Sequence, residues 1–145
     1  MAERTLEPGA AVLEAPAPVT ERPAQPLPYP DRAARHWIIS SIVWLTVVDL
    51  AGLVLSTEFV SPEAFGGISW LSFSRVRQEH VNGVILAWLT MMYFGALFYM
   101  LPRLCGTRGM WSERLGVWCA WAWNALLVLG AISLLTGHSQ GREYG

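Results

Sequence analysis

The architecture of the chain follows from residues 73–107, FSRVRQEHVNGVILAWLTMMYFGALFYMLPRLCGT. A charged lead-in reaches His80, and an uncharged run then extends from Val81 to Pro102. As a helix rising about 1.5 Å per residue, residues 81–101 are roughly 30 Å long, the thickness of the hydrocarbon core of a bilayer. The segment therefore predicts a membrane helix with an imidazole at one end.

The composition agrees with a membrane protein. Hydrophobic residues make up 53% of the chain and charged residues 14%, which lies on the apolar side of the range for soluble domains. The net charge of −1 gives no attraction for polyanions, so we expect no nucleic-acid partner.

Two further apolar runs, at residues 36–60 and 115–137, are also long enough to span, and the middle span covers 81–104. Their uninterrupted apolar character favours helices over strands. Residues 1–31 are rich in proline and alanine and have no apolar run, which predicts a disordered tail. We thus expect an all-α membrane protein with a tail at 1–31 and a three-helix transmembrane region at 32–145.

The arginines indicate an orientation. Five flank one side of the spans, Arg32, Arg35, Arg103, Arg108 and Arg114, and three flank the other, Arg75, Arg77 and Arg142. This excess favours a cytoplasmic N-terminus, with His80 at the outer end of the second helix. Three tryptophans fall near predicted span ends, where they are expected at the membrane interface: Trp37, Trp70 and Trp111.

Two polar residues lie near the middle of the membrane, Asp49 in the first span and Asn124 in the third. A lone carboxylate there costs about 2.5–3.5 kcal/mol on insertion scales, so it needs a partner or a proton. Counted from the predicted helix ends, the two residues have matching depth. We expect them to face each other or to share a polar partner.

The face of the second span below His80 carries a stripe of small residues and one methionine: Gly83, Ala87, Met91 and Gly95. Such a stripe lets helices pack closely. It also leaves room for a flat macrocycle held by the histidine. Haem is a candidate, because haem iron takes neutral imidazole and Arg75 and Arg77 could pair with haem propionates. The residues alone leave both readings open.

The same segment resembles the second helix of the haem-copper oxidase superfamily, in the branch of cbb3-type cytochrome c oxidase subunit I and nitric oxide reductase large subunits. The matching residues are Phe73, Arg75, Arg77, His80, Asn82, Tyr99, Pro102 and Arg103. The closing sequence Gln140-Gly141-Arg142-Glu143-Tyr144 is similar to the end of the third helix in that branch. The resemblance covers Ala33 to Gly145.

The resemblance implies a role for each matching polar residue. His80 corresponds to an axial ligand of the low-spin haem b, Glu143 to a calcium ligand, and Arg75 and Arg77 to neighbours of the haem propionates. It also implies a multi-pass protein of the bacterial inner membrane, in contact with lipid, the remaining helices of subunit I and cytochrome c-type partner subunits. Copper and the high-spin haem belong to later helices of the twelve-helix family members.

We therefore expect the N-terminal part of such a subunit, passing electrons to an oxygen-reducing centre. Because the ligands of the binuclear centre are not in this sequence, enzymatic activity of the chain alone stays uncertain. Three alternatives remain: a fragment of a nitric oxide reductase large subunit, a small b-type cytochrome ligated by His80 and His138, and a haem-free scaffold.

Overall fold

A computed structural model describes residues 29–138, and this part of the chain is helical with no strand. The elements are α1 (Arg32–Val60), the short 3₁₀ helix η1 (Ser69–Leu71), α2 (Phe73–Asn82), the π-helical segment η2 (Gly83–Leu89), α3 (Thr90–Leu104) and α4 (Glu113–Leu135). Because α2, η2 and α3 are continuous, three helices are long and apolar enough to cross a membrane. The expected three-helix membrane fold is confirmed.

The middle helix begins at Phe73 rather than at residue 81. Ser72, in an extended conformation, precedes it, and the charged lead-in forms its first turns. No glycine or proline interrupts this lead-in, and arginine, glutamine and glutamate are good helix formers. His80 consequently lies inside the helix and not at its end. At α4 the hydroxyl of Ser112 accepts a hydrogen bond from the Leu115 amide, a standard N-cap.

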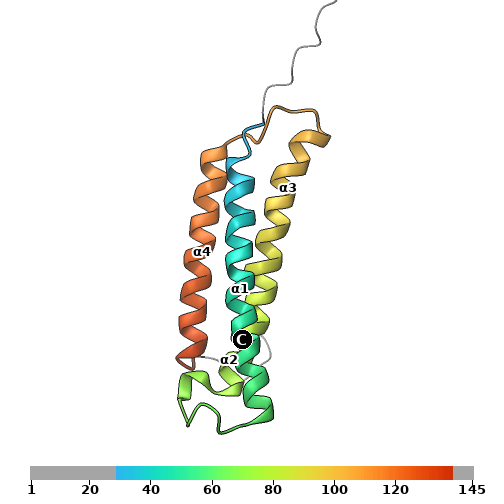
Figure 1. Cartoon of the computed structure of the whole chain (residues 1–145). Helices are drawn as coiled ribbons and strands as arrows, with labels where there is room; N and C mark the ends of the chain where they lie inside the picture. The colour runs from blue at the N-terminus through green and yellow to red at the C-terminus, as the bar shows by residue number, and fades with distance from the viewer. Residues whose placement is uncertain (1–28, 139–145) are drawn as a thin grey trace, which may run out of the picture.

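The helix α1 occupies the centre of the bundle, between α3 and α4 (Figure 1). Helices α1 and α4 begin at the same end and run parallel, whereas the middle helix runs antiparallel to both. The amide of Ala33 donates to the carboxylate of Glu113 at 2.7 Å, and so fixes the register of the two parallel helices. Small buried residues on α1, such as Ala33, Ala34 and Ser41, allow these close approaches.

The stripe of small residues packs against α1. All four of its members, Gly83, Ala87, Met91 and Gly95, are buried. A Cβ atom added to Gly95 would come within 2.5 Å of Ile38 Cγ1, and one added to Gly83 would collide with the Val48 side chain. Helix packing is therefore the reading that the structure supports, since this face leaves no room for a macrocycle.

The π-helical segment explains why a strict four-residue repeat stays on one face. In an α-helix, four residues overshoot one turn by about 40°, so such a stripe would wind away from its neighbour. The turns of η2 (Gly83–Leu89) are wider, which reduces this drift. Carbonyls in the segment also accept hydrogen bonds from both neighbours: Leu86 O from Trp123 Nε1 of α4 and Trp88 O from Ser41 Oγ of α1, each at 3.0 Å.

The tryptophans only partly follow the interfacial expectation. Trp70 and Trp111 are exposed at the ends of the bundle, but Trp37 is 3% exposed and packs against Met91 and Ala120. Its indole Nε1 donates to the Gly116 carbonyl at 2.9 Å. A buried indole N–H needs an acceptor, and Gly116, which has no side chain, leaves its carbonyl accessible to the indole. Trp37 thus lies near the start of α1, as expected, but inside the bundle rather than on its surface.

The expected pairing of Asp49 with Asn124 is also wrong. Asn124 Oδ1 accepts from Trp44 Nε1 at 2.8 Å, and its Nδ2 donates to Ser40 Oγ at 3.2 Å. Asp49 lies on an exposed face of α1. The reason is the register: α1 begins at Arg32, so its residue 44 is level with Asn124 and Asp49 lies about 7 Å further along the bundle.

Candidate functional site

The imidazole of His80 is held against α1. Its Nδ1 atom lies 2.8 Å from the carbonyl oxygen of Val48, and the ring is half-buried. The ring lies directly over Gly52, because a Cβ added there would come within 2.9 Å of Cε1 and 3.2 Å of Nδ1. The histidine thus has one orientation, set by a carbonyl and by the missing side chain of a glycine one turn further along α1.

This contact assigns the roles of the two ring nitrogens. A backbone carbonyl can only accept, so the proton of the neutral imidazole lies on Nδ1 and the lone pair lies on Nε2. No hydrogen bond to Nε2 is formed within residues 29–138. A histidine that ligates a metal has this arrangement, in which the second ring nitrogen donates to a carbonyl that fixes its tautomer and orientation. His80 is therefore chemically suited to be an axial ligand.

The two expected propionate neighbours lie on the same helix as His80. Arg75 Nη1 donates to the Leu135 carbonyl at 3.0 Å, and its guanidinium packs on Gly137. It therefore satisfies a free carbonyl at the end of α4, where the helix dipole favours a cation. Arg77 is half-buried and takes part in an interaction of its own. Both cations are held near the end of the bundle toward which His80 lies.

The expected calcium ligand, Glu143, lies outside the described residues. Within residues 29–138, no three histidine, cysteine, aspartate or glutamate side chains come together as a metal site. The other two described histidines bond locally: His36 Nδ1 to the Arg32 carbonyl and His138 Nδ1 to Thr136 Oγ1. His36 lies on the first turns of α1, at the opposite end of the bundle from α2.

The sequence did not reveal which residues contact the His80 ring. Val48 contributes only its carbonyl, which carries no residue-type signal, and Gly52 is one of several glycines in apolar helices. A glycine in the middle of a span is a signal of close approach, but it does not say which residue approaches. The partner of His80 depends on the register between α1 and α2, which the packing of Gly83 on Val48 sets.

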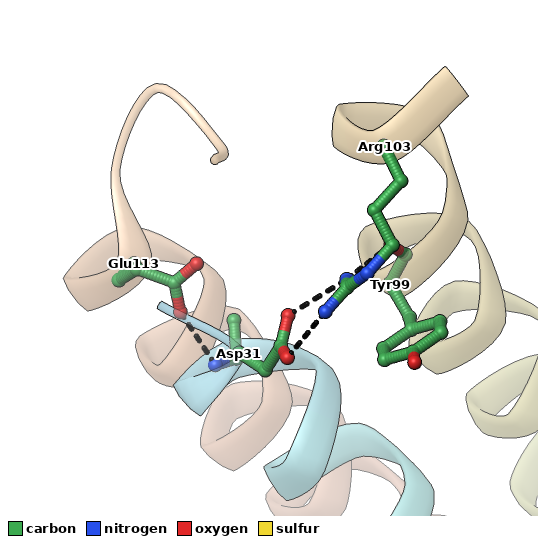
Figure 2. Close-up of polar contacts among 5 residues, drawn as sticks. Asp31, Tyr99, Arg103 and Glu113 are labelled. Atoms are coloured by element: carbon green, nitrogen blue, oxygen red, sulfur yellow. Dashed lines mark hydrogen bonds and ion pairs between the residues drawn. The ribbon is translucent and has the colours of Figure 1, made fainter. Parts of the chain in front are cut away.

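A second polar cluster lies at the other end of the bundle (Figure 2). Arg103 makes two hydrogen bonds to the Asp31 carboxylate, at 2.9 and 2.7 Å, and its guanidinium lies over the rings of Tyr29 and Tyr99. The Arg103 guanidinium, chiefly through these hydrogen bonds, holds the pKa of Asp31 below its usual value. The sequence motif includes Arg103 and Tyr99, but it does not include Asp31, the partner of Arg103.

Comparison with known proteins gives a family match over most of the chain. The family described as Cytochrome C and Quinol oxidase polypeptide I matches residues 32–145. Among curated proteins, the cbb3-type cytochrome c oxidase subunit CcoN1 of Stutzerimonas stutzeri is 29% identical over 116 residues. Cytochrome c oxidase subunit 1 of Rhodobacter capsulatus is 31% identical over 119 residues.

These matches cover unequal shares of the proteins compared. Each of the two covers 80% of this chain, but only 24% of the Stutzerimonas protein and 22% of the Rhodobacter protein. A cytochrome c oxidase subunit 1 homolog of Agrobacterium tumefaciens (strain T37) is 28% identical, with 88% and 23% covered. The chain thus spans about a quarter of the length of the curated relatives it matches.

Proposed function

Because this chain belongs to the cytochrome c and quinol oxidase polypeptide I family, we propose that it contributes an axial ligand of a low-spin haem b. The ligand is Nε2 of His80. The chain then acts as the first part of a cbb3-like respiratory subunit I, in the bacterial inner membrane with its N-terminus in the cytoplasm. The remaining helices of such a subunit supply the high-spin haem and copper.

The observation that carries the proposal is the hydrogen bond between His80 Nδ1 and the Val48 carbonyl. It leaves a lone pair on Nε2, which is the form of imidazole that haem iron binds. The side chain as a whole is half-buried. The residues present therefore fit an axial haem ligand.

The chain's own residues do three things in this function. Val48 and Gly52 orient the imidazole before any ligand arrives, which lowers the entropy cost of binding. The bound haem supplies one-electron redox chemistry. Arg75 and Arg77 provide positive charge near the end of the bundle, where it would offset the propionates. Glu143 is proposed to bind calcium, because a carboxylate oxygen is a suitable ligand for that ion.

Absorption spectra of the full chain, purified from haem-replete membranes, test the haem proposal. The wild type is expected to show a reduced b-type spectrum, which His80→Ala abolishes. His36→Ala and His138→Ala are the matched controls and retain it. Far-ultraviolet circular dichroism checks that each variant keeps its helices, and added imidazole should restore part of the spectrum of His80→Ala.

Two outcomes would overturn the assignment. A colourless wild-type chain that stays colourless with added haem would favour the scaffold interpretation. Equal loss in His80→Ala and His138→Ala would favour a small cytochrome ligated by both histidines.

A further inference from the structure

A groove opens at the end of the bundle where α1 and α4 begin. It has a volume of about 750 Å³, and its walls include Asp31, Arg32, Arg35, His36, Ile39 and Trp121. It lies at the opposite end of the bundle from α2, which carries His80. The groove is therefore separate from the proposed haem site.

The groove is positively charged although Asp31 lines it. The Asp31 carboxylate is already neutralised by the two hydrogen bonds from Arg103. The nearby carboxylate of Glu113 accepts the Ala33 amide instead of pairing with an arginine side chain. Arg32 and Arg35 are exposed, and within residues 29–138 neither side chain has a hydrogen bond or ion pair. Two cations thus face the groove without a counter-charge.

The polarity of the groove changes with depth. Arg32 lies at the start of α1, and Ile39 lies seven positions further, about 10 Å along the helix axis. Trp121 lies at a similar distance from the start of α4. Both apolar side chains are exposed, Ile39 by 56% and Trp121 by 62%. The groove is therefore cationic at the helix ends and apolar one to two turns deeper.

We propose that this groove binds the headgroup and upper acyl chain of an anionic phospholipid. The phosphate lies between the guanidinium groups of Arg32 and Arg35, and the chain lies along Ile39 and Trp121. Because α1 spans the membrane, the arginines sit at headgroup level and the indole sits at the interface, where tryptophan is favoured. Basic pockets between transmembrane helices bind anionic headgroups in this way.

A lipid fits this groove better than a free phosphate does. Inorganic phosphate would use only the two arginines and would leave Ile39 and Trp121 without a partner. The arginine excess also favours placing this end in the cytoplasm, and the cytoplasmic leaflet carries the anionic lipids.

Native mass spectrometry of the full chain in non-ionic detergent tests the proposal with phosphatidylglycerol and phosphatidylcholine as competing ligands. Each arginine near an anionic headgroup contributes about fivefold in affinity. The double variant Arg32→Gln/Arg35→Gln is thus expected to lower the preference for phosphatidylglycerol by about 25-fold. The control Arg108→Gln/Arg114→Gln removes the same charge at the same end, outside the groove, and should leave the preference within about twofold.

A second measurement locates the acyl chain. Brominated phosphatidylglycerol should quench a component of the tryptophan fluorescence that is absent from Trp121→Phe. Equal loss of preference in the two double variants would overturn the proposal, because it would indicate general surface charge. Full displacement of the lipid by a large excess of inorganic phosphate, with no quenching at Trp121, would also overturn it and would indicate a phosphate site.

Discussion

The imidazole of His80 rests on the backbone of Gly52, so closely that a single added carbon would come within 2.9 Å of its Cε1 atom. The same ring is anchored through Nδ1 to the carbonyl of Val48, one helical turn away. The position of the proposed ligand atom is therefore set by α1, although the histidine belongs to α2.

Gly52→Ala is expected to displace the ring of His80 and to weaken its bond to Val48. The haem absorbance of the purified chain should fall several-fold, because the imidazole loses its fixed orientation. Gly130→Ala is the matched control, since an added Cβ at Gly130 meets no atom within 4 Å. It should keep the absorbance, and it should be neutral or gain up to about 1 kcal/mol from higher helix propensity. Equal absorbance in both variants would contradict the contact.

The ion pair of Asp31 with Arg103 predicts a loss of stability in acid. Because Arg103 lowers the pKa of Asp31 in the folded state, the pair stabilises the fold above the unfolded pKa of about 3.9. This contribution is lost as the pH falls through the lower folded value. The contribution is small, because solvent screens a pair at the surface.

Unfolding in mixed micelles between pH 7 and pH 3 measures this effect. Asp31→Asn should remove the part of the acid sensitivity that comes from the pair. Arg103→Lys keeps the charge but loses the bidentate geometry, so it should retain only part of that sensitivity. The same pH dependence in the wild type and in Asp31→Asn would show that the pair does not contribute.

Asn124 and Trp44 should be energetically coupled. The indole of Trp44 donates to Asn124 at 2.8 Å within the membrane region, where no water replaces a lost acceptor. A double-mutant cycle with Trp44→Phe and Asn124→Ala should give a coupling of about 0.6–1.7 kcal/mol, between the average and the maximum measured for hydrogen bonds between membrane helices. The free energy of unfolding of the four proteins gives this value, and additive effects would argue against the bond.

Met91 should contribute more to the packing than any exposed methionine. Its side chain is fully buried against Trp37 of α1 and Ala120 of α4, so Met91→Ala leaves a cavity that costs about 2 kcal/mol or more. Met100→Ala makes the same chemical change at a side chain that is 46% exposed, and it should cost much less. Similar losses of unfolding free energy for both variants would mean that the core around Trp37 and Met91 is not formed.

The number of helices was predictable because hydrophobic length alone reports a membrane span. The interior contacts were not, since they depend on register. Starting the first span at residue 36 instead of Arg32 made Asp49 appear four positions shallower, which brought it closer to the depth of Asn124. The true partner, Trp44, had been assigned no polar role, because an indole looks apolar in a hydropathy pattern.

Only the part of the candidate site that consists of side chains was predictable from the sequence. His80 was identified from its position before an apolar run, and the family match is consistent with that segment. The Val48 carbonyl, which selects the tautomer, belongs to the backbone, and no residue type encodes it. The π-helical segment Gly83–Leu89 was likewise not predicted. Its sequence, GVILAWL, has no glycine–proline pair or other local signal for wider turns.

The winding of Gly83–Leu89 has a consequence for how the bundle assembles. Side chains of its two neighbours, Ser41 and Trp123, hold carbonyls of this segment, so the local pitch of one span depends on donors supplied by two others. A span inserted alone lacks those donors, and tightening to ordinary α-helical pitch would rotate everything beyond residue 89 relative to His80. The wide turns of Gly83–Leu89 are therefore expected to form together with the contacts to α1 and α4, rather than in the middle span alone.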